Sequence, residues 1–498
     1  MVDLVTVLTW LAVGSSAIAV AYLLVVNISY LSLTLLAIRQ LRRQIELDTY
    51  DPIGQFQSNR FLPGVAVVVP AFNEERVIVD TIQSLLALEY PNHEVILVND
   101  GSTDDTLARV REAFDLERVD AEYPVDLNCE PVRAIYRSTE EEFVLIDKEN
   151  GGKADALNAG LFFTDRELFC SVDADSLIER GALKDVVGPF LEKPDTVIAT
   201  GGAIRIANGC TFRDGVLTSV GLPGRRLVRF QSAEYLRAFL LGRIGLSNIR
   251  SLLVISGAFG LFKTSILREV GGYDTDSVTE DMEIVVRLQR YMYDSDPPHE
   301  VRFLPRPVAW TEAPTSIRVL SRQRRRWFRG MIDTLVKHRG AIGRPSYGVI
   351  GLFALPFYLF IETIGSLLEA VGYLLIPIFF IAGILDLQFF LTFLTIAVGL
   401  GAAVTVLAVF GEVITYRRYE KPGEIVVLLW YAILESIIYR PWRAFVRWRG
   451  TFEYLLGDQS WGRMIRVGAG SDDEHRRGRD AHRDAKPDRA TDSVDTDD

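Results

Sequence analysis

The chain has 498 residues, 49% of them hydrophobic, and is therefore too long for one ordinary domain and too apolar for a wholly soluble protein. Its formal net charge of −11 argues against a nucleic-acid partner. The cysteines Cys129, Cys170 and Cys210 lie far apart, without the paired spacing of a disulfide framework or a zinc site. The composition predicts a protein with soluble and membrane-embedded parts.

The N-terminal segment is apolar. No charged residue occurs from Leu4 to Ile38, a run longer than the roughly 20 residues that a membrane-spanning helix needs. Arg39 and its basic neighbours follow, and by the positive-inside rule they place the next domain in the cytosol. A cleaved signal peptide is the alternative, but Asp3 stands where such peptides are basic, and the run is too long. We predict that residues 1–43 form an N-terminal transmembrane helix.

Residues 44–313 are predicted to form a cytosolic α/β domain. Residues 65–70 are a continuous apolar run, typical of a strand covered on both faces. An amphipathic helix is predicted after them, then a strand over 94–100 that ends at Asp100, and a third strand over 132–136. Parallel βαβ units bind ligands beyond the carboxyl ends of their strands, where Asp100 lies.

A glycine-rich turn delivers Lys153 to the start of a helix. The two glycines before it let the backbone approach a ligand, and the helix N-terminus and the lysine both favour an anion. The spacing differs from that of a Walker loop. A solvated capping turn explains the same residues without any function.

Two carboxylates end the next predicted strand, 168–175. Asp173 and Asp175 are at positions i and i+2, so they point to the same side of a strand. Such a pair is unfavourable without a cation, and oxygen-only ligands with open positions suit Mg²⁺ or Mn²⁺ bridging to phosphates.

Thr279 is the predicted N-cap of a helix that continues to Leu288. Glu280 and Asp281 lie in the first turn of this helix, where acidic residues favour the helix dipole. Capping is a sufficient structural explanation. The functional alternative is a carboxylate base held at a rigid helix start.

Residues 314–345 are predicted to form an interfacial amphipathic helix. Gln323, Arg326 and Trp327 share one face of this helix, which we expect to meet a ligand. The opposite face is expected to meet lipid phosphates at the membrane surface, through Arg322, Arg325 and Arg329.

The C-terminal third is mostly apolar. In the block 346–416, residues 347–361 are predicted to be interfacial or re-entrant, and two transmembrane helices are predicted over 364–385 and 388–415. The segment 425–439 is short and has basic residues on both sides, so we predict interfacial or re-entrant helices within 417–467. The acidic tail, 468–498, is predicted to be disordered.

Between residues 64 and 330 the chain carries Asn-Asp-Gly-Ser, Gly-Gly-Lys-Ala-Asp, Asp-Ala-Asp, Thr-Glu-Asp and Gln-x-x-Arg-Trp, in that order. This order resembles the membrane-integrated processive family 2 glycosyltransferases, which include the cellulose, hyaluronan, chitin-oligomer and poly-N-acetylglucosamine synthases. The resemblance implies an α/β GT-A fold, with a mixed, mostly parallel sheet inserted between transmembrane and interfacial helices. It also implies a multi-pass protein of the cell membrane whose catalytic domain is cytosolic.

The resemblance assigns roles to the residues described above. Asp281 is implied to be the general base, with Glu280 beside it. Gln323, Arg326 and Trp327 are implied to close over the diphosphate and the acceptor sugar. The nucleotide-sugar is implied to bind Ala71, Glu74, Asp100, Lys153, Asp173 and Asp175, of which Asp173 and Asp175 would also hold the metal, Mg²⁺ or Mn²⁺.

The implied activity is inverting transfer of a sugar from a UDP-sugar to a growing β-linked polysaccharide, poly-N-acetylglucosamine or hyaluronan-like. Two alternatives stay open: transfer of one sugar to a membrane lipid, as in the similar ceramide glucosyltransferases, and a catalytically silent nucleotide-sugar-binding assembly subunit. The implied partners are the UDP-sugar donor, a polysaccharide or lipid acceptor and the bilayer. Because three spans are few for an export channel, a partner subunit or homo-oligomer is expected to complete it.

Overall fold

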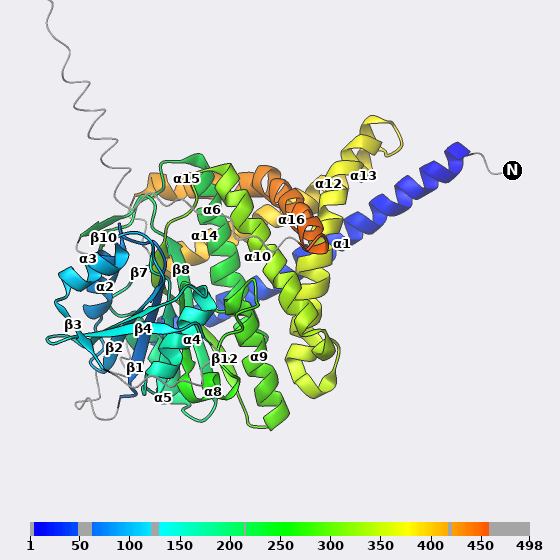
Figure 1. Ribbon diagram of the computed structural model, residues 1–498. Coiled ribbons are helices and arrows are strands. Elements are labelled where there is room, and N and C mark those ends of the chain that lie inside the picture. The colour runs from blue at the N-terminus through cyan, green and yellow to red at the C-terminus, as the bar shows by residue number, and fades with distance from the viewer. Residues whose placement is uncertain (1–3, 48–61, 121–128, 214–215, 417–420, 458–498) are drawn as a thin grey trace, which may run out of the picture. The chain divides into compact units, whose positions relative to one another are not determined.

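The computed structural model describes residues 4–47, 62–120, 129–213, 216–416 and 421–457. In this part of the chain, a ten-stranded mixed sheet has the order β3-β4-β5-β2-β1-β6-β11-β8-β12-β7 (Figure 1). Its strands are β1 (Val65–Ala71), β2 (His93–Asp100), β3 (Leu116–Val119), β4 (Val132–Ser138), β5 (Phe143–Lys148), β6 (Leu168–Val172), β7 (Leu177–Ile178), β8 (Val197–Ile206), β11 (Phe259–Lys263) and β12 (Glu300–Thr311). β9 (Thr211–Arg213) and β10 (Val216–Ser219) pair separately.

Parallel strands form the centre of the sheet. β1 pairs in parallel with β2 and β6, and β2 pairs in parallel with β5. Val65 to Val69 of β1 are fully buried, as the continuous apolar run predicts for a strand covered on both faces. The predicted mixed α/β sheet is confirmed.

Two strand predictions need correction. The third predicted strand is present as β4, but it pairs antiparallel with β5, which the sequence analysis missed, so it does not continue the βαβ alternation. β6 ends at Val172, and Asp173 and Asp175 follow in a turn in which the Ser176 N–H donates to the Asp173 carbonyl at 3.0 Å. The turn, not strand alternation, therefore positions this pair.

Helices cover the sheet. α4 packs on β1 and β2, and α5 packs on β8 and β12. A Cβ at Gly160 would collide with Val68, so the glycine lets α4 approach β1 closely. The helices between the first strand and residue 337 are α2 (Ile78–Leu86), α3 (Thr106–Ala113), α4 (Lys153–Phe163), α5 (Ala182–Glu192), α6 (Arg226–Tyr235), η2 (Leu236–Gly242), α7 (Arg243–Asn248), α8 (Thr264–Glu269), α9 (Glu280–Ser295) and α10 (Ile317–Lys337).

Four helical runs in the described residues are long and apolar enough to cross a membrane: Thr9–Leu41, Ile350–Ile381, Leu387–Val413 and Pro422–Leu455. The elements involved are α1 (Leu4–Leu47), η5 (Ile350–Ala354), α11 (Leu355–Phe357), η6 (Tyr358–Ile364), α12 (Gly365–Ile381), α13 (Leu387–Leu394), η7 (Thr395–Leu400), α14 (Gly401–Tyr416), α15 (Pro422–Leu434), η8 (Glu435–Tyr439) and α16 (Arg440–Leu455), and the short η3 (Arg339–Ala341) and η4 (Pro345–Tyr347) precede η5.

The helical runs differ from the predicted membrane segments at two places. Most of the segment 347–361 belongs to the run Ile350–Ile381, which starts well before the predicted boundary at 364. The segment 425–439 continues without a break into α16, so it belongs to a run of 34 residues. Segment 425–439 contains one charged residue, Glu435, which is fully buried, and Glu362, directly after segment 347–361, pairs with Arg447 at 3.2 Å. Burial and pairing of this kind allow charged residues within a long apolar helical run. The predicted disordered tail, 468–498, lies outside the described residues.

Candidate active site

Asp100 ends β2 and is buried. Its carboxylate accepts hydrogen bonds from the N–H groups of Gly151 and Gly152, at 2.9 and 2.8 Å, and from Nζ of Lys148, at 2.9 Å. Gly152 has φ +90°, a conformation that glycine adopts without strain. Asp100 therefore fixes the shape of the Gly-Gly turn that leads into Lys153.

Lys148 is a residue that the sequence analysis missed. It ends β5, directly opposite Asp100 in the parallel register of β2 and β5, and its ammonium group also pairs with Asp155. The signal that could have found it is a lysine two residues after the apolar run 143–146, at the end of a strand whose neighbour ends in the carboxylate of Asp100. Lys148 neutralises carboxylates under the turn and is itself fully buried.

The loops that follow β1 and β2 are tied together. Ala71 is the buried last residue of β1, and the N–H of Glu74 donates to Oγ1 of Thr106 at 2.9 Å. Asn73 has φ +58° and accepts from the N–H of Thr103 at 2.7 Å. Because the two strands are parallel neighbours, these loops form one edge beyond their carboxyl ends.

Lys153, the first residue of α4, joins two of the predicted motifs. Its Nζ lies 2.6 Å from Oδ1 of Asp173 and 2.7 Å from Oε1 of Glu280. Burial opposes the charged form, but the two carboxylates outweigh burial, so the pKa of Lys153 is raised. Gly-Gly-Lys, Asp-x-Asp and Thr-Glu-Asp therefore meet at one ammonium group.

Asp173 and Asp175 lie together at the end of β6. Burial raises the pKa of Asp173, and the charge of Asp175 raises it further, although Lys153 opposes both. No cluster of three or more His, Cys, Asp or Glu residues that could hold a metal occurs among the described residues. The pair fits a divalent cation whose remaining positions are filled by water and phosphate oxygens.

Asp281 lies in the first turn of α9. Its Oδ2 accepts from the N–H of Gly257 at 3.2 Å, and its Oδ1 accepts from the N–H of Met282 at 2.8 Å. Burial, together with the charge of Glu280, raises the pKa of Asp281 to about 6. Thr279 is the N-cap residue of α9, as predicted, but its side chain makes no capping hydrogen bond.

Glu280 differs from its neighbour because it is paired. Burial would raise the pKa of Glu280, but Lys153 lowers it, and the net pKa is below the usual value. Arg326 contributes to this lowering, which places its guanidinium near the same carboxylate. Of the two acidic residues, Asp281 accepts a proton more readily.

Gly257, in the loop before β11, was also missed by the sequence analysis. A Cβ there would lie 2.9 Å from Nζ of Lys153 and 3.5 Å from Cβ of Asp281. No periodicity marks this glycine, because its importance comes from residues more than twenty positions away. Because Gly257 has no side chain, there is room for the contact between Lys153 of the Gly-Gly-Lys motif and Glu280 of the Thr-Glu-Asp motif.

The face of α10 that carries Gln323, Arg326 and Trp327 is half-buried. A Cβ at Gly330 would collide with Thr279, so α10 packs closely on the start of α9. Oε1 of Gln323 is buried and has no hydrogen-bond partner among the described residues. Trp327 stands edge-on to Phe239, with ring centroids 6.4 Å apart.

The opposite face of α10 is only partly as predicted. Arg322 and Arg325 line a surface groove, but Arg329, which was expected at the membrane surface, is buried. Arg324, which the prediction left without a role, is also buried. The reason is that α10 packs between α9 and α16. These neighbours bury more of its surface than would be buried in a helix that lies on a membrane.

Glu234, on α6, holds Arg324 in place. Its carboxylate accepts from Arg324 at 2.7 Å, from Arg443 at 2.6 Å and from the hydroxyl of Tyr439 at 2.8 Å. Burial would raise the pKa of Glu234, but the two arginines lower it to about 2. The guanidinium of Arg324 lies 4.3 Å from the ring centroid of Trp327, so this Glu234 cluster (Glu234, Arg324, Tyr439 and Arg443) borders the predicted acceptor face.

Similar proteins with curated functions are polysaccharide synthases. The poly-beta-1,6-N-acetyl-D-glucosamine synthase of Staphylococcus epidermidis is 30% identical over 277 residues, covering 55% of this chain and 56% of the relative. The enzyme of the same name from Staphylococcus aureus strain COL is 29% identical over 280 residues, with the same coverage. The chain spans about half the length of the curated relatives it matches.

Similar solved structures include the mannosyltransferase PcManGT from Pyrobaculum calidifontis in complex with GDP-Man and Mn²⁺, with a TM-score of 0.49 and 18% identity over 84% of this chain and 99% of that chain. Staphylococcus aureus TarS 1–349 in complex with UDP-GlcNAc has a TM-score of 0.35 and 14% identity, over 82% and 95%. A chitin synthase family model matches residues 286–488. The model of Glycosyltransferase like family 2 matches residues 63–330, more than half of the chain, and the chain therefore belongs to this family.

Proposed function

We propose that this chain transfers a sugar from a UDP-sugar to a growing β-linked polysaccharide, with inversion at the anomeric carbon. The observation that carries the proposal is the ammonium of Lys153, which lies between Asp173 and Glu280 and beside the turn that holds Asp281. Because the curated relatives are named poly-beta-1,6-N-acetyl-D-glucosamine synthases, we propose a poly-N-acetylglucosamine-like product.

Asp281 acts as the general base in this proposal. The acceptor hydroxyl must lose its proton as its oxygen attacks the anomeric carbon, and one carboxylate within hydrogen-bond reach is enough for a single inverting displacement. A pKa of about 6 makes Asp281 a stronger base than an ordinary aspartate while it stays ionised near neutral pH. Glu280, paired with Lys153, is the positioning residue beside it.

The leaving group is a nucleoside diphosphate, on which negative charge increases in the transition state. Lys153 and Arg326 are proposed to stabilise this charge, because both cationic groups lie near Glu280. Asp173 and Asp175 would hold Mg²⁺ or Mn²⁺, which supplies Lewis-acid stabilisation of the diphosphate when it is bound. The ammonium of Lys153, which contacts Asp173 here, would then be available to a phosphate oxygen.

The nucleotide is proposed to lie at the edge formed by the loops after β1 and β2. Ala71, Glu74 and Asp100 belong to this edge. Asp100 is engaged with the Gly-Gly turn, so we propose that it maintains the turn as well as bordering the uracil. Gln323, whose amide oxygen has no hydrogen-bond partner among the described residues, and the half-buried Trp327 are proposed to contact the acceptor sugar.

The test is to incubate membranes containing the protein with a panel of labelled UDP-sugars and to size the products. A long polymer formed from UDP-N-acetylglucosamine supports the proposal. A lipid carrying one sugar, without polymer, would refute processive synthesis and favour the lipid transferase. If the purified protein releases no UDP with any donor, the chain is not an active transferase, and the assembly-subunit function is then the remaining candidate.

The same proposal places the catalytic domain in the cytosol and the chain in the cell membrane as a multi-pass protein, with a partner subunit or homo-oligomer completing the export path. The four candidate spans support a multi-pass protein, and Arg42 and Arg43, which follow the first span, support a cytosolic catalytic domain. Protease treatment of sealed right-side-out and inside-out vesicles tests it. Cleavage of the catalytic domain is expected only in inside-out vesicles.

A further inference from the structure

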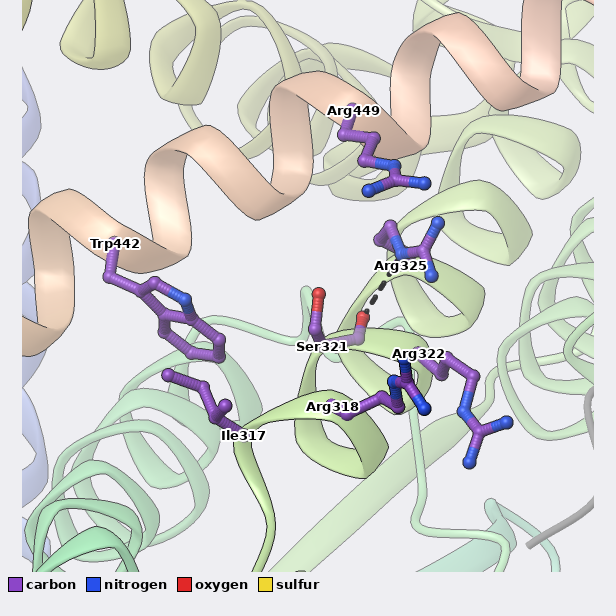
Figure 2. Close-up of a pocket in the computed structure, with 7 residues that line it drawn as sticks. All are labelled: Ile317, Arg318, Ser321, Arg322, Arg325, Trp442 and Arg449. Carbon is purple, nitrogen blue, oxygen red and sulfur yellow. Dashed lines mark hydrogen bonds between the residues drawn. The ribbon is translucent and has the colours of Figure 1, made fainter.

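An arginine-lined groove lies between α10 and α16, on the other side of α10 from Gln323 and Arg326. It has a volume of about 540 Å³ (Figure 2). Figure 2 shows side chains of both helices turned toward this space. The lining residues that matter here are Ile317, Arg318, Arg322, Arg325, Trp442 and Arg449, and we call this site the arginine groove.

The arginine groove carries excess positive charge. Arg325 pairs with Glu453, which also accepts from Arg449 at 3.2 Å. Arg318 and Arg322 have no ion pair with a carboxylate in the described ranges. Four guanidinium groups therefore line the groove with one carboxylate, which leaves an excess of positive charge that favours binding of an anion.

Helix geometry adds to this charge. α10 begins at Ile317, so the positive end of a helix of 21 residues lies beside Arg318. Arg318, Arg322 and Arg325 are spaced four and three residues apart, so they line the same side of α10. Guanidinium groups bind phosphate oxygens in pairs, which makes a phosphate the anion that this arrangement fits best.

The surface next to the arginine groove is apolar. Large side chains on α16 are exposed at helical spacing: Phe445 (36%), Trp448 (36%), Phe452 (52%) and Leu455 (72%). Ile317, at the groove itself, is 57% exposed. Exposed aromatic residues beside arginines are typical of the membrane interface, and α16 belongs to a helical run long and apolar enough to cross a membrane. A phosphate in this groove would therefore be attached to a lipid.

We propose that the arginine groove binds the phosphate of an anionic phospholipid headgroup. Arg318 and Arg322 provide the unpaired charge, Arg325 and Arg449 close the groove from its two sides, and Trp442 covers the glycerol region. The acyl chains then lie along the exposed apolar residues of α16. This site is separate from the site proposed for the nucleotide-sugar, and it does not depend on the identity of the product.

The test measures lipid binding by the full-length protein in a neutral detergent, by native mass spectrometry, with phosphatidylglycerol or phosphatidylcholine added. The wild type is expected to retain phosphatidylglycerol in preference to phosphatidylcholine. In the double variant Arg318→Gln/Arg322→Gln, affinity for phosphatidylglycerol should fall about 25-fold, since each basic residue contributes about fivefold near an anionic surface. Arg449→Gln tests the groove from the other helix and should lower the affinity about fivefold.

The matched control is Arg225→Gln/Arg226→Gln. It removes two exposed arginines at the start of α6, outside the arginine groove, and should leave the preference for phosphatidylglycerol unchanged. Unaltered thermal unfolding verifies that each variant is folded. Equal retention of phosphatidylglycerol by the wild type and the Arg318/Arg322 double variant would overturn the proposal. So would displacement of the lipid by inorganic phosphate at equal concentration, because the site would then bind a soluble anion.

Discussion

Two buried acidic clusters in this molecule have opposite electrostatic balance. Glu234 receives two guanidinium groups and a hydroxyl, and its pKa is lowered to about 2. In the candidate active site, Lys153 contacts both Asp173 and Glu280, while the Asp281 carboxylate accepts from the N–H groups of Gly257 and Met282 and has its pKa raised to about 6.

This difference in charge balance distinguishes a structural cluster from a reactive one. At Glu234 two guanidinium groups surround one carboxylate, so the carboxylate stays ionised and its ion pairs join α6, α10 and α16. In the candidate active site the carboxylates outnumber the ammonium group, so the site retains affinity for a cation and a proton. The following experiments test whether this contrast in charge balance corresponds to a contrast in role.

The largest effect is expected for Asp281→Asn. Removing the general base should lower the rate of sugar transfer about 100- to 10,000-fold. UDP binding should be retained, because the Asp281 carboxylate accepts hydrogen bonds from the N–H groups of Gly257 and Met282 and is proposed to act on the acceptor hydroxyl. Labelled-sugar transfer and calorimetric titration with UDP measure the two quantities. Asp276→Asn, a change at an exposed neighbouring carboxylate, is the control, and full activity of Asp281→Asn would remove this residue from the mechanism.

The next effect should come from Glu234→Gln, which leaves the charges of Arg324 and Arg443 buried without their carboxylate. Breaking a buried ion pair in this way costs about 3–5 kcal/mol, so thermal unfolding in detergent should occur at a clearly lower temperature. Glu89→Gln, which removes an exposed pair with Lys184, is the control and should change little. An unchanged unfolding temperature for Glu234→Gln would mean that the cluster does not stabilise the fold.

A smaller change should follow Gly330→Ala, which tests how tightly α10 is held on the start of α9. The added methyl group would collide with Thr279, and overpacking of this kind costs about 1–3 kcal/mol. We expect lower thermal stability and slower transfer, because α10 must move away from Glu280 and Asp281. Gly340→Ala is the matched control, since no atom lies within 4 Å of its added Cβ. Equal behaviour of the two variants would show that the helices separate easily.

The smallest effect is the pH dependence of the wild type. Asp281 must be ionised to accept a proton, and its pKa is about 6, so kcat/KM should fall as the pH drops below about 6, by about tenfold per pH unit. Above this pH the rate should level off. Transfer assays between pH 5 and pH 8 measure the profile, and a rate independent of pH across about pH 6 would argue against Asp281 as the base.

The grouping of the site residues could largely be predicted from the sequence. Asp100, Asp173 and Lys153 all lie at strand ends or helix starts on one edge of a sheet, and Asp281 begins a helix beside them. Such positions follow from apolar runs and turns that are local in sequence. The structure brings Lys153, Asp173 and Glu280 into direct contact.

Other features depend on contacts between distant parts of the chain. Nothing near Glu234 in the sequence indicates that it meets residues at 324, 439 and 443, and Gly257 has no local pattern that marks it. For α10, helical periodicity predicted two faces, and of the second face Arg322 and Arg325 line a surface groove. Periodicity could not show that packing against α9 and α16 would bury Arg324 and Arg329, because burial depends on the neighbours that the fold supplies.

The Glu234 cluster also affects how the protein can be divided for experiments. The family model ends at residue 330, which invites expression of a fragment that stops after α10. Such a fragment would contain Glu234 and Arg324 but lack Tyr439 and Arg443, and it would expose the surface that α16 covers. A useful minimal fragment must therefore extend through α16, and chimeras with relatives should exchange α6, α10 and α16 together.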